Sequence, residues 1–539
     1  MTLFPSAAEL APFLPEVIVI CAIALVLLVP IFSPKKNSAA VAFAAGLGLL
    51  LAIVALLRID PAAITAPLFG GLLLIDPFAW FLKLIILIFT FFVLMLWAFA
   101  TRDSFAPGDA PEFFTLLLSA TLGMMLMVST TNLLMMFLAI ETASLPSYVL
   151  AGFRKTHKLG AEAALKYVLF GAVSAAIMLY GMSMLYGYFA TLDLAQIAAQ
   201  LHNPASPFAF SGQLTGSNHA IPYASAIFYL GFPIMAILIG VGFKVAMFPV
   251  HFWCPDVFEG THIDITTFLS VASKGAGIGL FLRIILTLVG THGAVAANLQ
   301  WLVIGVTVVA AATCFVGNLG ALVQTNIKRL LAFSSIAHAG YILLAVAALM
   351  VPESSTSARP AQAAIFYLFG YLFMNAGAFS AAAAISQKIG SEDIRDYAGL
   401  GRRAPILAFC MAIFVFSLTG IPLTVGFSVK LKLFQVLFDA TSPLAYFALT
   451  VLAVNTVIAA FYYFRILKAM YLTTSDKEPA AGWLPTTALA VAMVVPNIGL
   501  FVAYNWLDDQ SHAFAHLQAP AMIQPTHAAA PAAVAPPLP

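Results

Sequence analysis

Residues 236–256 read AILIGVGFKVAMFPVHFWCPD, an apolar run that contains a lysine and several helix-interrupting residues. Gly240 and Gly242 weaken a helix, and Pro249 lacks the backbone N–H that a helix interior uses. A membrane tolerates interrupted backbone only where the freed polar groups face protein or water. The stretch therefore predicts a broken transmembrane helix, with water beside Lys244 and conditions that suit reversible proton binding.

A second stretch, residues 416–434, reads FSLTGIPLTVGFSVKLKLF and repeats this pattern in the other half of the chain. Gly420, Pro422 and Gly426 precede Lys430. Paired interrupted helices are typical of inverted structural repeats, with function at the breaks. We therefore expect a three-helix segment, two repeats of five helices each, a last helix and an Ala/Pro-rich disordered tail, at 1–110, 111–290, 291–470, 471–510 and 511–539.

The composition is that of a membrane protein. Of the 539 residues, 62% are hydrophobic and 9% are charged, whereas soluble domains are about half apolar and about a quarter charged. A helix needs about 20 apolar residues to cross a bilayer. Fourteen windows qualify, at 14–33, 38–58, 78–100, 112–130, 132–152, 160–190, 221–250, 263–289, 299–319, 327–350, 361–388, 405–437, 443–466 and 484–507. The sequence thus predicts an all-α integral membrane protein with about 14 transmembrane helices, and a net charge of +2 gives no sign of a nucleic-acid partner.

Basic residues concentrate in the loops on one side of this arrangement. Fifteen of the 24 Lys and Arg residues fall there, namely Lys35, Lys36, Arg102, Arg154, Lys155, Lys158, Lys328, Arg329, Lys388, Arg395, Arg402, Arg403, Arg465, Lys468 and Lys477. Because basic loops stay in the cytoplasm, we expect a cell inner (cytoplasmic) membrane protein with both termini outside, in the periplasm of a bacterium. The N-terminus does not resemble a cleaved signal, since Glu9 and Glu16 come before any basic residue.

The sequence lacks motifs for redox cofactors. The four cysteines, Cys21, Cys254, Cys314 and Cys410, are widely separated, which argues against an iron–sulfur or zinc site and against a disulfide scaffold. No G-x-G-x-x-G fingerprint stands in a strand–helix setting. We therefore expect this chain to bind no redox cofactor and no metal.

Several ionisable side chains fall inside the expected helices, where each charge costs at least about 2.5–3.5 kcal/mol. Glu141 lies in the middle of the window at 132–152, and Lys166 lies near the start of the next window. The short connection makes these two helices antiparallel neighbours, so the two side chains could meet. Such a pair would be either part of a proton pathway or a purely structural ion pair.

Three more residues complete a row of candidate proton-transfer groups. Lys274 lies in FLSVASKGAG among small residues that allow close packing or a water-filled gap. His251 follows the first break, and His338 lies in KRLLAFSSIAHAGY. Histidine exchanges protons near neutral pH, although a single buried histidine is more often just a satisfied polar residue. The candidate row comprises Glu141, Lys166, Lys244, His251, Lys274, His338 and Lys430.

Three further cations have simpler explanations. Lys83 and Arg283 are expected to extend from helix ends to the membrane interface. Lys432 follows Lys430 by two positions, so it faces another side of the helix and is expected to contact a loop. A scaffold without transport, in which the charges only hold helices together, is an alternative to a proton pathway.

Five stretches, together with the second broken-helix stretch, match a known family. They are MMFLAIETASLPSYVLAGFRK (135–155), GAEAALKYVLFGAVSAAIMLYG (160–181), FKVAMFPVHFWCPDVFEG (243–260), FLSVASKGAG (268–277) and KRLLAFSSIAHAGY (328–341). They closely resemble the antiporter-like membrane subunits of proton-pumping NADH–quinone oxidoreductase (respiratory complex I), and the subunit N family in particular. The S-L-P-S-Y-V-L-A run favours this family over the sister subunits L and M.

The resemblance implies a proton-translocating subunit that couples electron transfer from NADH to quinone, in other subunits, to proton pumping. In the family, the residues that match Glu141 and Lys166 form a pair, and Lys244 and Lys430 match the broken-helix lysines. NADH, FMN, iron–sulfur clusters and quinone would belong to the complex, not to this chain. The expected neighbours are the lipid bilayer, antiporter-like subunit M and small subunits of the K and J type. A subunit of a related multi-subunit cation/proton antiporter is the alternative.

The resemblance also covers two other candidates and shows one departure. Lys274 matches the lysine of the family's eighth helix, and His251 matches the histidine of its P-x-H-x-W-x-P-D stretch. After PDVFEG the family usually continues A-P-T-P, whereas this chain continues Thr261-His262-Ile263-Asp264. Two extra ionisable groups therefore lie near the cytoplasmic mouth of the first break, which leaves open how protons enter there.

Overall fold

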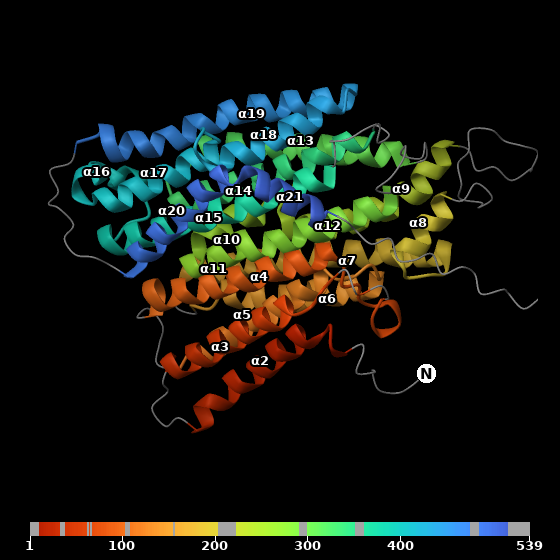
Figure 1. Cartoon of the computed structure of the whole chain (residues 1–539), viewed down its shortest axis with the longest axis horizontal. Helices are drawn as coiled ribbons and strands as arrows, with labels where there is room; N and C mark the ends of the chain where they lie inside the picture. Colours follow the sequence, from red (N-terminus) through yellow and green to blue (C-terminus); the bar gives the residue numbers. More distant parts are fainter. Residues whose placement is uncertain are drawn as a thin grey trace, which may run out of the picture.

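The computed structural model describes residues 10–32, 38–61, 64, 67–102, 108–154, 157–202, 223–289, 299–350, 360–474 and 485–515. In these residues the regular secondary structure is helical, apart from three isolated β-bridges. The long helices run side by side as one bundle (Figure 1). Among the described residues, twelve helices are long and apolar enough to cross a membrane, and two shorter apolar helices, Leu230–Val245 and Pro405–Thr419, lie at the two predicted breaks. The prediction of an all-α membrane fold is confirmed.

The N-terminal helices lie at one edge of the bundle, red to orange in Figure 1. They are α2 (Leu14–Phe32), α3 (Ser38–Leu57) and α4 (Pro77–Leu96). Pro77 fits the first helical position of α4, and the Asp76 side chain accepts a hydrogen bond from the Ala79 N–H at 2.8 Å. α4 continues through the π-helical turn η2 (Trp97–Thr101). Asp76 therefore fixes where α4 begins.

The next group of helices contains the first break. It begins with α5 (Ala110–Met127), α6 (Leu133–Ala151), α7 (Lys158–Phe189), α8 (Leu194–His202) and α9 (Tyr223–Val245). After α9 a non-helical link that contains Pro249 leads to α10 (Trp253–Gly260). α11 (Ile263–Phe268) then passes through a π-helical segment, η4 (Leu269–Ser273), into α12 (Lys274–Val289). The predicted break is confirmed, whereas η4 is an irregularity that hydropathy did not predict.

The remaining helices contain the second break. They are α13 (Gln300–Leu322), α14 (Ile327–Leu344), α15 (Pro360–Ile389), α17 (Pro405–Thr419), α18 (Val425–Asp439), α19 (Pro443–Leu467), α20 (Pro485–Val502) and α21 (Tyr504–Phe514). Gly420 ends α17 at φ +90°, in the left-handed region that glycine adopts without strain. The predicted break between α17 and α18 is therefore confirmed.

The predicted disordered tail begins too early. Residues 511–514 belong to α21, because Phe514 is held by aromatic packing, with its ring 4.6 Å from that of Phe81 and 5.6 Å from that of Trp80. Residues 516–539 lie outside the described part of the chain. The C-terminal helix is thus docked back onto the start of α4.

One local arrangement occurs twice in the bundle. Asn132 caps α6 and forms an isolated β-bridge with Asp193, and Asn326 caps α14 and forms one with Asp393. In each case the asparagine side chain accepts hydrogen bonds from two backbone N–H groups of its helix. The helix before each cap also approaches it closely: a Cβ on Gly123 or on Gly317 would lie 2.3 or 2.5 Å from a backbone nitrogen of α6 or α14, respectively. The same contacts thus recur in both halves of the chain.

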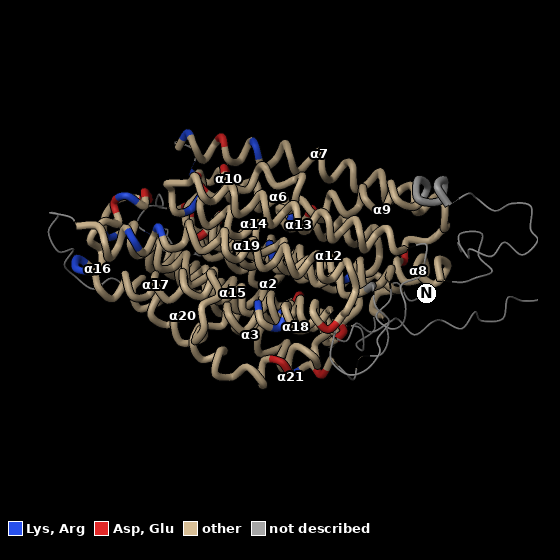
Figure 2. Tube along the Cα trace, turned by 90° about the horizontal axis from the view of Figure 1, so that it is seen from above, with Lys and Arg blue, Asp and Glu red and all other residues tan. Residues whose placement is uncertain are grey.

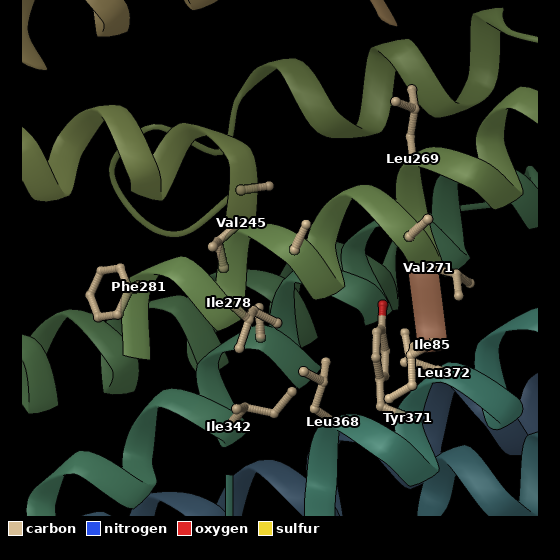
Figure 3. Packing of buried hydrophobic residues seen from close by; sticks show 14 of the residues in the cluster. Ile85, Val245, Leu269, Val271, Ile278, Phe281, Ile342, Leu368, Tyr371 and Leu372 are labelled. Carbon is tan, nitrogen blue, oxygen red and sulfur yellow. The ribbon is translucent and has the colours of Figure 1, made fainter. Parts of the chain in front are cut away.

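The core lies where α12, α14 and α15 meet. Nearly all of their residues are buried, whereas α7, α19 and α20 are mostly exposed. Figure 3 shows Ile278 of α12, Ile342 of α14 and Leu368 and Tyr371 of α15 packed together. In Figure 2, Lys and Arg gather at the end of the bundle that carries α16 (Leu400–Arg403) and the start of α7. Buried charges in the central helices are therefore exceptions to the pattern.

Candidate functional site

Lys244 lies in the last turn of α9, immediately before the first break, and is 1% exposed. α12 passes close to it, because a Cβ on Gly277 would lie 3.1 Å from the Lys244 Cβ. Among the described residues the Lys244 Nζ has no hydrogen-bond partner, and the Glu141 carboxylate acts on it electrostatically. A buried amine without a fixed partner gains little from holding its charge, so it can both bind and release a proton.

Lys274 is the first residue of α12 and follows the π-helical segment η4 directly. It is fully buried, and its Nζ donates a hydrogen bond of 2.5 Å to the Ser335 Oγ on α14. The Nζ also lies 5.6 Å from the ring centroid of Phe258. Single-turn π segments occur often at functional sites, since they redirect a side chain and free backbone groups. Lys274 therefore joins the first half of the bundle to α14.

His338 lies on α14 and is buried. Its Nδ1 is 3.0 Å from the hydroxyl of Tyr367 on α15, and its ring lies 5.4 Å from that of Tyr371. Both Lys274 and Lys430 act on His338 electrostatically. The imidazole thus interacts electrostatically with one lysine of each half of the chain.

Lys430 lies on α18, after the second break, and reaches back across it. Its Nζ donates hydrogen bonds to the carbonyls of Thr419 at 2.8 Å and Leu418 at 3.3 Å, at the C-terminal end of α17. These carbonyls have no helical partner, and the negative end of the helix dipole favours a cation there. The Nζ also lies 5.2 Å from the ring centroid of Tyr341. The broken helix therefore provides a binding site for the protonated amine.

His251 lies in the link after the first break, largely buried. Its ring packs 4.3 Å from that of Phe252, and Lys274 acts on it electrostatically. The link thus turns this histidine toward the Lys274 side of the bundle.

The predicted contact between Glu141 and Lys166 is wrong. Glu141 is only partly buried on α6, and Lys244 acts on it electrostatically. Lys166 instead pairs with Asp256 at 2.6 Å and with Glu162, one turn earlier on α7, at 2.7 Å. The reason is that α10, which follows the first break, packs against α7 and brings Asp256 to Lys166.

The comparisons with known proteins agree with one another. Residues 130–458 match the family described as NADH:quinone oxidoreductase/Mrp antiporter, TM. A protein of Anaeromyxobacter sp. (strain Fw109-5), called NADH-quinone oxidoreductase subunit N, is 41% identical over 82% of this chain and 83% of its own length. The chain belongs to the subunit N family.

Solved structures support the same fold for this subunit N family member. A chain of the respiratory complex I structure from Thermus thermophilus with bound aureothin is 28% identical, with a TM-score of 0.69 over 92% of this chain and 98% of that one. A chain of the Mrp complex from Dietzia sp. DQ12-45-1b has a TM-score of 0.75 over 95% and 97%, at 22% identity. The second likeness shows a shared fold alone.

Sequence reasoning missed a group of ion pairs at the basic end of this subunit N family member. Arg329 Nη1 lies 2.6 Å from Asp256 and 2.7 Å from Glu259. Burial alone would raise the pKa of Asp256, but hydrogen bonds from Lys166 and Arg329 lower it below its ordinary value. Asp256 thus ties α7, α10 and α14 together. The motif C-P-D after the first break was the available signal, because it places a carboxylate at a helix start.

The prediction for Lys83 and Arg283 is also wrong, since neither extends to the interface. Lys83 pairs with Glu16 at 2.7 Å, and both are buried. Arg283 makes two hydrogen bonds to the Asp76 carboxylate, at 2.9 and 2.7 Å, in a buried bidentate pair. Both pairs join α4 to a neighbouring helix.

Lys432 turns away from the break, as expected for a residue two positions from Lys430. Its Nζ lies 2.7 Å from the Asp508 carboxylate, so it contacts α21 and not a loop. Gln362 of α15 donates to the same carboxylate at 2.8 Å. Lys83, Arg283 and Lys432 are thereby occupied in ion pairs that hold helices together.

Proposed function

We propose that this chain is the proton-translocating, antiporter-like membrane subunit of an NADH–quinone oxidoreductase. Electrons pass from NADH to quinone in other subunits of the complex. This subunit itself is non-redox and moves protons along a row of buried Glu, Lys and His side chains. The relatives named NADH-quinone oxidoreductase subunit N support this assignment.

The observation that carries the proposal is the electrostatic coupling of five ionisable groups in and beside the core, as one pair and one set of three. Glu141 acts on Lys244, whereas Lys274 and Lys430 both act on His338. Two unit charges about 8 Å apart at an effective dielectric of about 20 interact by about 2 kcal/mol. That energy changes a proton-binding constant by more than tenfold. Loading one site therefore changes the proton affinity of the next, which is what a stepwise relay requires.

Lys166 and His251 have supporting positions in this proposal. Lys166 lies at the edge of the row of candidate proton-transfer groups, because its ion-pair partner is Asp256 and not Glu141. Its positive charge can shift when the pair with Asp256 opens, so it modulates the row and does not carry the proton itself. His251 lies in the link beside the first break, on the Lys274 side, and serves as a second route into the row.

The proposal includes two inverted repeats, at 111–290 and 291–470. The recurrence of the asparagine cap, the β-bridge and the glycine contact at α6 and α14 supports it. The positions of the breaks also support it. The first break follows the fourth apolar helix of its repeat, after α5, α6, α7 and α9, and the second follows α13, α14, α15 and α17. A relay through both breaks then has one opening toward each side of the membrane.

The rest of the assignment follows from membership of the complex. In this proposal the chain lies in the bacterial inner membrane with both termini in the periplasm, and the distribution of basic loops supports that orientation. Its neighbours are other membrane subunits, with antiporter-like subunit M and the small K- and J-type subunits as the expected contacts. NADH, FMN, iron–sulfur clusters and quinone are bound by other subunits.

Substitution of Lys244 tests the proposal in inside-out membranes that contain the assembled complex. Lys244→Ala should lower NADH-driven proton uptake and quinone reduction together, by about tenfold or more, because a positioned proton-transfer group is lost. Lys244→Arg should be little better, since arginine does not release its proton. The matched control is Lys468→Ala, which removes an exposed lysine from the basic end of the bundle. Normal proton uptake in an assembled Lys244→Ala complex would support a scaffold instead.

A subunit of a multi-subunit cation/proton antiporter is the second candidate. The shared fold with the Mrp complex favours it, although at lower identity than the subunit N relatives. Purification separates the two: copurification with flavin and iron–sulfur subunits supports the first, and copurification with antiporter subunits alone supports the second.

A further inference from the structure

A polar cavity of about 380 Å³ opens at the end of the bundle that carries the basic loops. Its walls come from η2, the segment before α7, the end of α10, the start of α14 and the end of α15. Polar and charged side chains line it, including Thr101, Arg154, Lys328, Gln387 and Glu392. A cavity of this size and lining has room and hydrogen-bond partners for several waters.

Asp264 is hydrogen-bonded to the wall of this cavity. Thr101, which lines the cavity, donates a hydrogen bond of 2.9 Å to the Asp264 Oδ2, and the Ile265 N–H donates to Oδ1 at 2.9 Å. The Asp264 side chain is fully buried, and no ion pair of the described residues includes it. Burying a carboxylate without a cation costs free energy, and exchange of a proton with nearby water relieves that cost.

From Asp264 a line of polar side chains leads into the core. Thr267, Ser270 and Ser273 follow at about helical spacing on α11 and η4, and all are buried. Lys274 comes next, at the start of α12. Buried hydroxyl groups therefore recur along the continuous segment from Asp264 to one of the candidate relay lysines.

Side chains on α15 make hydrogen bonds with this line of polar residues. Asn375 donates hydrogen bonds to the Ser270 Oγ and, at 2.9 Å, to the Tyr371 hydroxyl, which in turn donates to the Ser270 carbonyl at 3.3 Å. Among the described residues the buried Asn375 Oδ1 has no partner, which suits a water in the line. The Tyr371 ring lies 5.4 Å from that of His338.

The other charged side chains around the cavity are both basic and acidic, and none of them takes the place of Asp264 as a buried proton acceptor. Arg154, His157 and Lys328 line the cavity together with Glu259 and Glu392, and Lys328 pairs with Glu392 at 2.9 Å. Burial, followed by repulsion from Arg154, Lys328 and His157, lowers the pKa of His262 to about 3. His262 therefore stays neutral near pH 7, and Asp264 is the fully buried carboxyl that is hydrogen-bonded to a residue of the cavity wall.

We propose that Asp264 is the proton acceptor that connects this cavity, through the buried hydroxyl groups of α11 and η4, to Lys274. The inference rests on the proposed function and adds an entry site to it. A hydronium ion in the cavity gives a proton to the carboxylate and becomes water, and the carboxyl then gives the proton through hydroxyl groups and water to the neutral Lys274 amine, which becomes ammonium. Nothing is oxidised or reduced in this step. A purely structural carboxylate at the start of α11 is the competing explanation, because acidic residues stabilise helix starts.

Asp264→Asn separates these explanations in the complete complex. The amide oxygen can still accept from the Ile265 N–H, and the amide NH2 can donate to the Thr101 hydroxyl, but the side chain no longer binds and releases a proton. We expect NADH-driven proton uptake and quinone reduction to fall about tenfold, less than the 10²–10⁴ of a lost proton-transfer group because cavity water substitutes in part. Asp264→Glu should restore most of the rate. The control is Glu112→Gln, which removes an exposed carboxylate at the start of α5.

Measurement of Lys244→Ala in parallel distinguishes failure of this inference from failure of the proposed function. Uptake within twofold of wild type for Asp264→Asn, with Lys244→Ala strongly impaired, overturns the entry site and leaves the function standing. Normal uptake in both variants overturns both. Equal loss for Asp264→Asn and Asp264→Glu also overturns the entry site, since only a structural role would reject the second carboxyl.

A cysteine in the cavity tests the proposal without removing the carboxyl. Ser386 lines the cavity and is partly exposed, so Ser386→Cys can be labelled by a charged, membrane-impermeant thiol reagent. Labelling should slow proton uptake at least fivefold in Ser386→Cys. Wild-type complex treated with the same reagent is the control for labelling of the exposed Cys21. Unchanged uptake after complete labelling would overturn the cavity as the entry route.

Discussion

Gly420→Ala should disturb the binding site of Lys430 without removing any ionisable group. A Cβ at position 420 would lie 2.8 Å from the Lys430 Cδ, and the residue has φ +90°. The left-handed conformation alone costs an alanine about 1–2 kcal/mol. The clash also moves the Lys430 side chain, whose Nζ now donates to the carbonyls of Thr419 and Leu418.

The expected magnitude follows from those two hydrogen bonds. A hydrogen bond from a charged group contributes about 1.5–3 kcal/mol. Loss of one of them from protonated Lys430 weakens proton binding there by roughly ten- to a hundredfold, at about 1.36 kcal/mol for each factor of ten. Proton uptake driven by NADH should therefore fall by about tenfold in inside-out membranes, while the complex still assembles.

Gly390→Ala is the matched control for this experiment. Gly390 also has a positive φ, +71°, but no heavy atom lies within 4 Å of where its Cβ would be. Both variants should lose similar thermal stability from backbone strain, and only Gly420→Ala should lose proton uptake. Equal rates of proton uptake in the two variants would refute the conclusion that carbonyls of α17 hold Lys430 for its function.

Two further predictions concern ion pairs outside the row. Arg283→Met should lower the stability of the assembled complex by about 3–5 kcal/mol, because it leaves the buried Asp76 carboxylate uncompensated. The double variant with Asp76→Leu should recover part of that loss, and thermal unfolding measures both. Asp256→Asn should lower stability at pH 7, where the carboxylate is charged and bound by Lys166 and Arg329. Because the pKa of Asp256 is lowered in the folded protein, this contribution is complete above about pH 4, the ordinary aspartate value, and is lost as the pH falls through the lowered pKa. A stability difference that persists unchanged into acid would contradict it.

The breaks could be predicted from sequence because their causes are local. Glycine and proline act on the backbone of the residues that carry them, so Pro249 and Gly420 are informative without any knowledge of the fold. Hydropathy likewise located the long helices, since a bilayer requires long apolar runs. The π-helical segment before Lys274 left no such signal, because it depends on packing against other helices.

The partners of the charged residues could not be predicted in the same way. Lys83 pairs with Glu16, and Arg283 pairs with Asp76. In both pairs the two residues are far apart in the sequence. Lys166 was assigned to Glu141 because consecutive helices are neighbours, but α10 introduced a closer carboxylate. Adjacency along the chain is therefore a weak guide to ion pairs once a helix is broken.

The three core lysines differ in what holds them. Lys430 binds two helix-terminal carbonyls, Lys274 binds one hydroxyl, and the Lys244 Nζ has no hydrogen-bond partner among the described residues. Carbonyls at a helix C-terminus stabilise a charged amine more than a hydroxyl does, because the helix dipole adds to the hydrogen bonds. The fold itself therefore provides hydrogen bonds for the charge on Lys430, whereas the charge on Lys244 depends on the Glu141 carboxylate. A change at Glu141 then acts on the core lysine that has no hydrogen-bond partner among the described residues, so the electrostatic signal from Glu141 directly changes how often Lys244 carries a proton.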